Sequence, residues 1–205
     1  MGALKKEDHV FTYADYLRWN DDQRWEILEG CAYNMSPAPS RNHQKISGSI
    51  FNRFFNYLND KTCEVYAAPI DVRLCEPGQQ DEDIITVVQP DILVCCDSSK
   101  LDDKGIKGSP DLIIEITSPS TASLDLKTKY QLYQKYGVKE YWIVNPLEES
   151  IMLNFLGADG LYAKPEFFAG EDSIQPRLFH ELLIDLNEIF SRPEKSTEKQ
   201  PPRLP

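Results

Sequence analysis

Hydrophobic residues recur at two spacings along residues 12–190, and these spacings predict a series of strands and helices. A helical spacing of apolar positions over 40–59, after the N-capping Ser40, predicts a long amphipathic helix. The other predicted helices begin at Thr12 and span 121–137 and 180–190. The predicted strands are short apolar runs between polar turns, at 25–35, 63–74, 87–96, 110–117, 140–146 and two places within 150–168.

Residues 110–146 have the order strand, helix, strand, which is typical of a parallel βαβ unit. Gly137 is a suitable residue for ending its helix. The strands on either side of this unit have patterns typical of antiparallel pairing, and 75–84 and 97–109 are predicted as polar loops. We therefore predict an α/β fold (α+β by a stricter naming), with a mixed central β-sheet flanked by helices.

The 205 residues are enough for one sizeable core, and we predict a single domain over 12–190 after an N-terminal arm, 1–11. The tail 191–205 is polar and rich in proline, so we expect it to be disordered. No apolar run approaches the roughly 20 residues that span a bilayer. The first residues lack the apolar segment of a secretory signal. These features predict a cytoplasmic protein without a membrane partner.

The net charge of −11 counts against a protein that coats nucleic acid through non-specific phosphate contacts. It is compatible with an enzyme that has a local basic groove or acidic groups holding metal ions. The five cysteines have no CxxC spacing, which argues against a disulfide framework and a zinc site. We interpret the neighbours Cys95 and Cys96 as small core residues.

Glu115 is a carboxylate in the middle of the apolar strand at 110–117, where burying a charge is costly. Asp91 follows Pro90 at the start of the apolar run "DILVCC". If these strands pair, both carboxylates approach one point, where they repel each other unless a proton or a cation intervenes. A divalent ion that prefers oxygen ligands, Mg²⁺ or Mn²⁺, is the simplest partner.

Lys129 is a second unusual charge, in the helix predicted at 121–137. At about 100° per residue, Lys129 falls inside the apolar arc that contains Leu126, whereas Lys127 and Lys135 face solvent. A lysine directed at the sheet needs an anionic partner, and the carboxylates of the preceding strands are candidates. Two acids, a metal ion and a lysine are the groups needed to activate water and stabilise a phosphate transition state.

Three segments of the chain resemble the Uma-type restriction-endonuclease family, a branch of the PD-(D/E)XK nuclease superfamily. They read "RWEILEGCAYNMSPAPSRNHQKISG", "VVQPDILV" and "PDLIIEITSPSTASLDLKTKYQLYQKYGVKEYWIVNP". The resemblance covers roughly residues 12–190 and implies a restriction-endonuclease-like core. It also implies that Asp91 and Glu115 bind Mg²⁺ (or Mn²⁺) and take part in catalysis. The usual lysine position of the superfamily is Thr117 here, and the resemblance implies that Lys129, on the following helix, is the catalytic lysine.

The same resemblance assigns Glu26 to the metal site and His43 to an accessory position without a defined role. Each residue also has a structural interpretation. Asp91 can cap a turn, and Lys129 can form an ion pair with Asp125 on its own helix. His43 can be a core or capping residue, and Glu26 can face solvent on its strand.

The resemblance implies a metal-dependent endonuclease that hydrolyses phosphodiester bonds in DNA. The alternative is a nuclease-derived fold that serves as a binding or assembly module without catalysis, which the acidic charge favours. A hydrolase of another phosphoester is a third reading of the same residues. We expect a homodimer by analogy, because two symmetric sites cut both strands of a duplex most easily.

Overall fold

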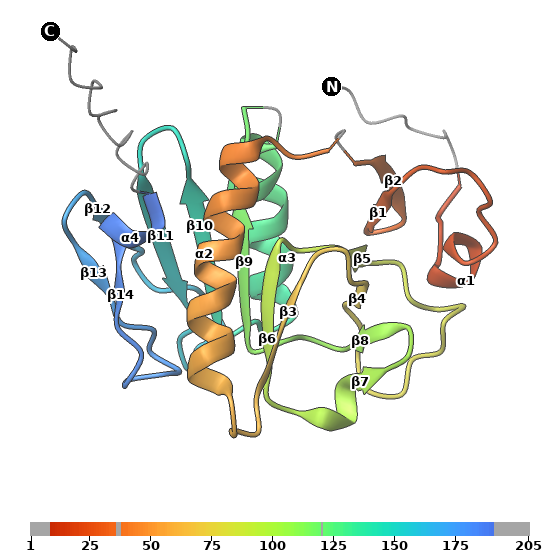
Figure 1. The fold of residues 1–205 in the computed structure, drawn as a ribbon. Coiled ribbons are helices and arrows are strands. Elements are labelled where there is room, and N and C mark those ends of the chain that lie inside the picture. The colour runs from red at the N-terminus through yellow and green to blue at the C-terminus, as the bar shows by residue number, and fades with distance from the viewer. Residues whose placement is uncertain (1–8, 36–37, 120, 191–205) are drawn as a thin grey trace, which may run out of the picture.

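A mixed six-stranded sheet forms the centre of the computed structural model, which describes residues 9–35, 38–119 and 121–190. Parallel pairing joins β9 to β10, and the other neighbours in this sheet pair antiparallel. The predicted βαβ unit and the mixed sheet are therefore confirmed (Figure 1). In spatial order the strands are β12 (Glu166–Ala169), β11 (Ser150–Phe155), β10 (Glu140–Asn145), β9 (Leu112–Ile116), β6 (Ile92–Cys95) and β3 (Glu64–Ala67).

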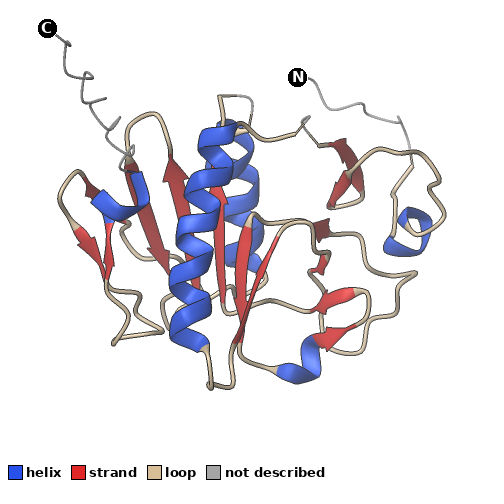
Figure 2. Cartoon of the chain, viewed as in Figure 1, coloured by secondary structure: helices blue, strands red, loops and turns tan. Residues whose placement is uncertain are grey.

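Helices cover both faces of this sheet, as Figure 2 shows in blue. On one face, α2 (Arg41–Leu58) and α4 (Leu186–Phe190) pack over a core that includes Phe54 and Trp142. On the other face lie a π-helix, Leu124–Lys129, and α3 (Tyr130–Lys135). Among the described residues, no helix has the length and apolar character needed to cross a membrane.

A second six-stranded sheet of short strands lies beside the β3–β6 edge of the central sheet (Figure 1). The short helix α1 (Tyr13–Tyr16) accompanies it and begins at the predicted Thr12, which forms a capping box with Asp15. The strands are β2 (Cys31–Asn34), β1 (Trp25–Leu28), β5 (Val87–Val88), β4 (Val72–Arg73), β8 (Gly105–Lys107) and β7 (Leu101–Asp102). A separate two-stranded ribbon joins β13 (Ser173–Ile174) to β14 (Ile184–Asp185).

Several predicted elements are divided in the structure. The strand predicted at 25–35 is a hairpin, because Glu29 and Gly30 turn the chain with positive φ angles of 49° and 81°. The strand predicted at 87–96 splits at Pro90, so its halves β5 and β6 join different sheets. The loop predicted at 97–109 contains a 3₁₀ turn, Ser98–Lys100, and the β7–β8 hairpin.

The sequence-based interpretation of Cys96 as a small core residue is wrong. Strands β3 and β6 pair antiparallel with Glu64 opposite Cys95, and the same register places Cys63 opposite Cys96. The two residues form a disulfide, whereas Cys95 is buried with a free thiol. Cysteine spacing cannot predict this pair, because the two cysteines are 33 residues apart and meet only through the register of two strands. The predicted tail at 191–205 and residues 1–8 of the predicted arm lie outside the described residues.

Glu140, at the start of β10, is fully buried away from solvent. Its carboxylate accepts hydrogen bonds from Trp142 Nε1 at 2.8 Å and from the Leu178 amide at 3.3 Å. Burial outweighs these bonds and raises the pKa of Glu140 from 4.5 to about 7. The fold therefore disfavours the ionised form, so stability should fall as the pH rises from the unfolded pKa towards 7.

Between pH 5.5 and 8, ionisation of Glu140 is expected to remove about 2 kcal/mol of unfolding free energy. Urea unfolding at both pH values should show a smaller loss for Glu140→Gln than for the wild type. Glu148→Gln changes an exposed acid just after the same strand and should keep the wild-type pH dependence. An unchanged pH dependence in Glu140→Gln would contradict this assignment.

Candidate functional site

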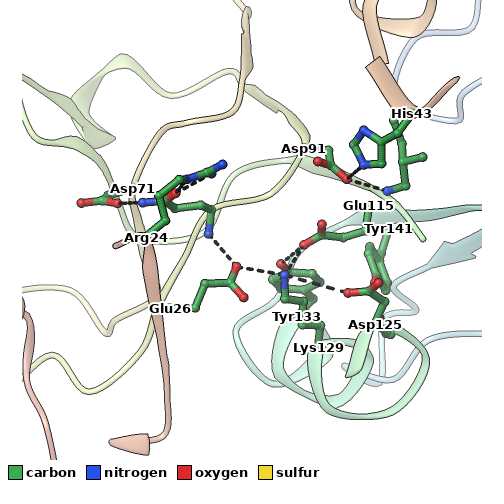
Figure 3. A network of polar contacts seen from close by, with 12 residues as sticks. Arg24, Glu26, His43, Asp71, Asp91, Glu115, Asp125, Lys129, Tyr133 and Tyr141 are labelled. Carbon is green, nitrogen blue, oxygen red and sulfur yellow. Dashed lines mark hydrogen bonds and ion pairs between the residues drawn. The ribbon is translucent and has the colours of Figure 1, made fainter. Parts of the chain in front are cut away.

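Lys129 is the centre of a buried cluster of charges between the two sheets (Figure 3). Its Nζ donates to Glu26 Oε1 and to Glu115 Oε1, each at 2.9 Å, and lies 3.9 Å from Asp125 Oδ1. Glu26 comes from β1, Glu115 from β9, and Lys129 and Asp125 come from the π-helix. All four side chains are buried. Glu26 and Lys129, which are in direct contact, are 103 positions apart in the sequence.

The π-helix explains how Lys129 reaches this cluster. In a π-helix each residue bonds to the fifth residue along, so the chain turns less per residue than the 100° used for an α-helix. The predicted apolar arc was wrong at Leu126, which is 48% exposed. Asp125 and Lys129 instead point inward together. Lys129 therefore forms both the predicted ion pair with Asp125 on its own helix and contacts with carboxylates of the sheets.

Asp91 lies immediately before β6, next to the Lys129 cluster. The register that pairs Ile92 with Ile114 places Asp91 opposite Glu115 when it is continued by one residue. Asp91 Oδ2 accepts the Ile116 amide at 2.8 Å and contacts His43 Nε2 at 3.2 Å. His43 lies in the first turn of α2, so that helix holds it over the carboxylate (Figure 3).

Tyr133, on α3, is a further member of the cluster. It is fully buried, but its hydroxyl donates to Glu115 Oε1 at 2.7 Å. The position four residues after Lys129 is a signal that could have identified it, because such residues share one side of a helix. The hydroxyl of Tyr141 donates to the Asp125 carbonyl at 3.1 Å and so attaches the π-helix to β10.

The cluster contains more acidic than basic groups. Burial raises the pKa of Glu115 to about 8, and Lys129 opposes this shift while Asp125, Asp91 and Glu26 add to it. Burial also raises the pKa of Asp125 to about 6. Burial alone would lower the pKa of Lys129, but Glu115 and Glu26 raise it well above its usual value. Lys129 therefore stays protonated. The remaining negative charge of the cluster favours the binding of a proton or of a second cation.

Two carboxylates of the site suit a divalent ion. Mg²⁺ and Mn²⁺ prefer anionic oxygen ligands, which Asp91 and Glu115 supply. Among the described residues, the contacts of Asp91 use Oδ2 and those of Glu115 use Oε1, so the second oxygen of each remains for a ligand. Within the described residues, no group of three His, Cys, Asp or Glu side chains is already placed to hold a metal ion. A divalent ion would therefore be bound by Asp91 and Glu115 and stabilised by the excess negative charge of the cluster.

Tyr133→Phe is expected to lower the unfolding free energy by about 1–2 kcal/mol, because it removes a donor to a buried carboxylate. Tyr130→Phe is the matched control, since Tyr130 lies on the same helix and packs its ring without a hydrogen bond to this cluster. Chemical denaturation of both variants measures the difference. Equal losses in the two variants would show that the Tyr133 hydroxyl does not support Glu115.

The chain was compared with known proteins. A family model described as "Putative restriction endonuclease", Uma2, matches residues 13–187. "Uncharacterized protein slr1290" from Synechocystis sp. is 28% identical over 149 residues, which cover 71% of this chain and 74% of that protein. The crystal structure of "a putative nuclease" from Anabaena variabilis has a TM-score of 0.69 at 18% identity, covering 88% of this chain and 98% of that one.

The match to the Anabaena variabilis structure confirms the predicted restriction-endonuclease-like core at the level of the fold. The family match spans residues 13–187 and so includes every residue of the Lys129 cluster, from Glu26 to Tyr133. On this evidence of family and fold, the chain belongs to the Uma2 family, which is described as "Putative restriction endonuclease".

Proposed function

We propose that this protein is a metal-dependent endonuclease that hydrolyses phosphodiester bonds in DNA. One observation carries the proposal: Lys129 Nζ lies 2.9 Å from Glu115, and the strand register sets Asp91 opposite that same residue. A fixed ammonium beside two carboxylates is suited to phosphate chemistry, in which negative charge develops on the phosphoryl oxygens.

Asp91 and Glu115 would hold the ion, Mg²⁺ or Mn²⁺, and Glu26 would support the site as a third acid. A divalent ion bound there would lower the pKa of a coordinated water and supply the nucleophile. His43 and the Ile116 amide fix Oδ2 of Asp91, which orients Oδ1 for the ion. Tyr133 fixes Oε1 of Glu115 in the same way.

Lys129 would act on the substrate as a hydrogen-bond donor. Glu26 and Glu115 take two of the three protons of its ammonium group, so one remains for a phosphate oxygen or for the attacking water. Because these two carboxylates keep Lys129 protonated, it serves as an electrostatic group and not as a base. We extend the proposal to a homodimer, whose two sites would cut the two strands of a duplex.

The second candidate function is a binding or assembly module without catalysis. The net charge of −11 favours it, because phosphate backbones are repelled by an acidic surface. The internal ion pairs of Lys129 also favour it, since they satisfy the cluster without any ligand.

A plasmid assay tests the two candidates. Supercoiled DNA is incubated with the wild type and Mn²⁺ or Mg²⁺, or with EDTA, and nicked and linear products are measured. The nuclease proposal predicts cleavage with either metal ion and none with EDTA. Cleavage that persists in EDTA would contradict the metal-dependent mechanism. If no DNA form is cut with millimolar Mn²⁺, the binding module is the better account.

A further inference from the structure

Gln89 joins the Lys129 cluster to a second polar network, which contains Arg24, Asp71 and Tyr16. Its main-chain amide donates to Glu26 Oε1 at 2.9 Å, the same oxygen that accepts from Lys129. Gln89 is buried and lies two residues before Asp91, in the segment that connects β5 to β6. Gln89 therefore contacts Glu26 directly and lies close to Asp91 along the chain.

The side-chain amide of Gln89 is held at both ends. Its oxygen accepts from Arg24 Nε at 3.0 Å and from Arg24 Nη2 at 2.6 Å. Its nitrogen donates to Asp71 Oδ1 at 2.8 Å and to the Tyr16 hydroxyl at 3.2 Å. These partners come from α1, from the segment before β1 and from the segment before β4. A neutral side chain with four such bonds has one preferred orientation.

This arrangement matters because the members of the Lys129 cluster come from different sheets. Glu26 belongs to β1 of the second sheet, whereas Glu115 belongs to β9 of the central sheet. The chain passes from the second sheet to the central sheet between β5 and β6, at Gln89 and Pro90. The position of Glu26 relative to Lys129 thus depends on how this crossing is fixed. Figure 3 shows Glu26 between Lys129 and the side of the network that carries Arg24 and Asp71.

We propose that Gln89 is a positioning residue: its anchored amide sets Glu26 against Lys129 and thereby places the ammonium for catalysis. This inference rests on the proposed nuclease function for its kinetic consequence. Its structural consequence, the placement of the Lys129 ammonium, does not depend on that function. Small misplacements of a catalytic group are costly, since a shift of about 1 Å can reduce a rate by about 10²-fold.

Gln89→Met tests the inference, because methionine keeps the main-chain amide and a similar volume but loses every side-chain bond. Arg24 is exposed, and Arg24→Met removes both donors to the Gln89 oxygen. This variant tests the positioning role of Gln89 if Gln89→Met does not fold. Gln134→Met is the matched control, since the Gln134 oxygen also accepts a main-chain amide, but that amide belongs to Tyr162 and not to a residue of the Lys129 cluster.

Two measurements are made on the full chain. The first is Mn²⁺-dependent plasmid cleavage over a range of DNA concentrations. We expect kcat to fall about tenfold or more in Gln89→Met, and less in Arg24→Met, with KM within about twofold of the wild type. The second is the ¹⁵N spectrum of lysine-labelled protein, in which the Lys129 ammonium signal is identified by its loss in Lys129→Met. This signal should shift or broaden in both test variants and stay unchanged in Gln134→Met.

A wild-type Lys129 signal and a wild-type kcat in both Gln89→Met and Arg24→Met would overturn the inference. Equal losses in Gln134→Met would also overturn it, because they would reflect a general loss of stability. If the wild-type protein cuts no DNA, the proposed function fails. The Lys129 ammonium signal alone then tests whether Gln89 positions Lys129. A shift in both test variants then supports the positioning role, and no shift contradicts it.

Discussion

Lys129→Met is expected to lower the unfolding free energy by about 3–5 kcal/mol, because it leaves buried acids without their counter-charge. Glu26 and Glu115 each accept a hydrogen bond from the ammonium, and Asp125 lies 3.9 Å from it. None of these side chains can reach water easily, since each is buried. The large expected loss measures the penalty of the unpaired acids more than the strength of the ion pairs themselves.

Urea unfolding of Lys129→Met provides the measurement, and Lys127→Met provides the control. Lys127 lies on the same π-helix but is exposed, so its replacement should change stability by less than about 0.5 kcal/mol. Adding Glu115→Gln to Lys129→Met should recover part of the loss, because one of the unpaired charges is removed. A loss in Lys129→Met as small as that in Lys127→Met would mean that Lys129 is not the counter-ion of this cluster.

Glu115→Gln is expected to reduce DNA cleavage by at least about 10³-fold, which corresponds to about 4 kcal/mol of activation free energy. The amide keeps the size of the side chain but removes the charge that would hold a divalent ion and that fixes the Lys129 ammonium. Asp91→Asn should have a similar effect, because Asp91 is the other proposed ligand and lies opposite Glu115 when the β6–β9 register is continued by one residue. Plasmid cleavage with Mn²⁺ measures both variants.

Asp111→Asn is the matched control for these two variants. Asp111 is another buried acid, located immediately before β9, and it contacts Lys139 and the Cys96 amide instead of the Lys129 cluster. Its replacement should leave the cleavage rate within about threefold of the wild type once the folded fraction is matched. A folded Glu115→Gln protein that cuts DNA at the wild-type rate would contradict the proposed mechanism.

The sequence was sufficient to predict the features that depend on local pattern. The apolar stripe of α2 and the apolar runs of β9 and β10 lie where the spacing of hydrophobic residues indicates. Glu115 and Lys129 were recognisable because a charge in an apolar setting is unusual. Their direct contact agrees with the expectation that a lysine facing the sheet has an anionic partner.

The remaining features depend on interactions that no local pattern records. The π-helix changes the rotation per residue, so a wheel drawn for an α-helix misplaced Leu126. Gln89 and Tyr133 are neutral, so no charge in an apolar setting marks them, and only the spacing of Tyr133 from Lys129 points to the cluster. The Cys63–Cys96 disulfide depends on the register of β3 against β6. Each of these features is determined by the tertiary structure.

The central claim is that Asp91, Glu115 and Lys129 form one pocket that binds a divalent cation. Anomalous diffraction from crystals soaked in millimolar MnCl₂ tests it most directly. We predict a manganese peak coordinated by carboxylate oxygens of both Asp91 and Glu115, with the Lys129 ammonium beside it. A pocket without manganese, or manganese bound only elsewhere on the protein, would contradict the claim.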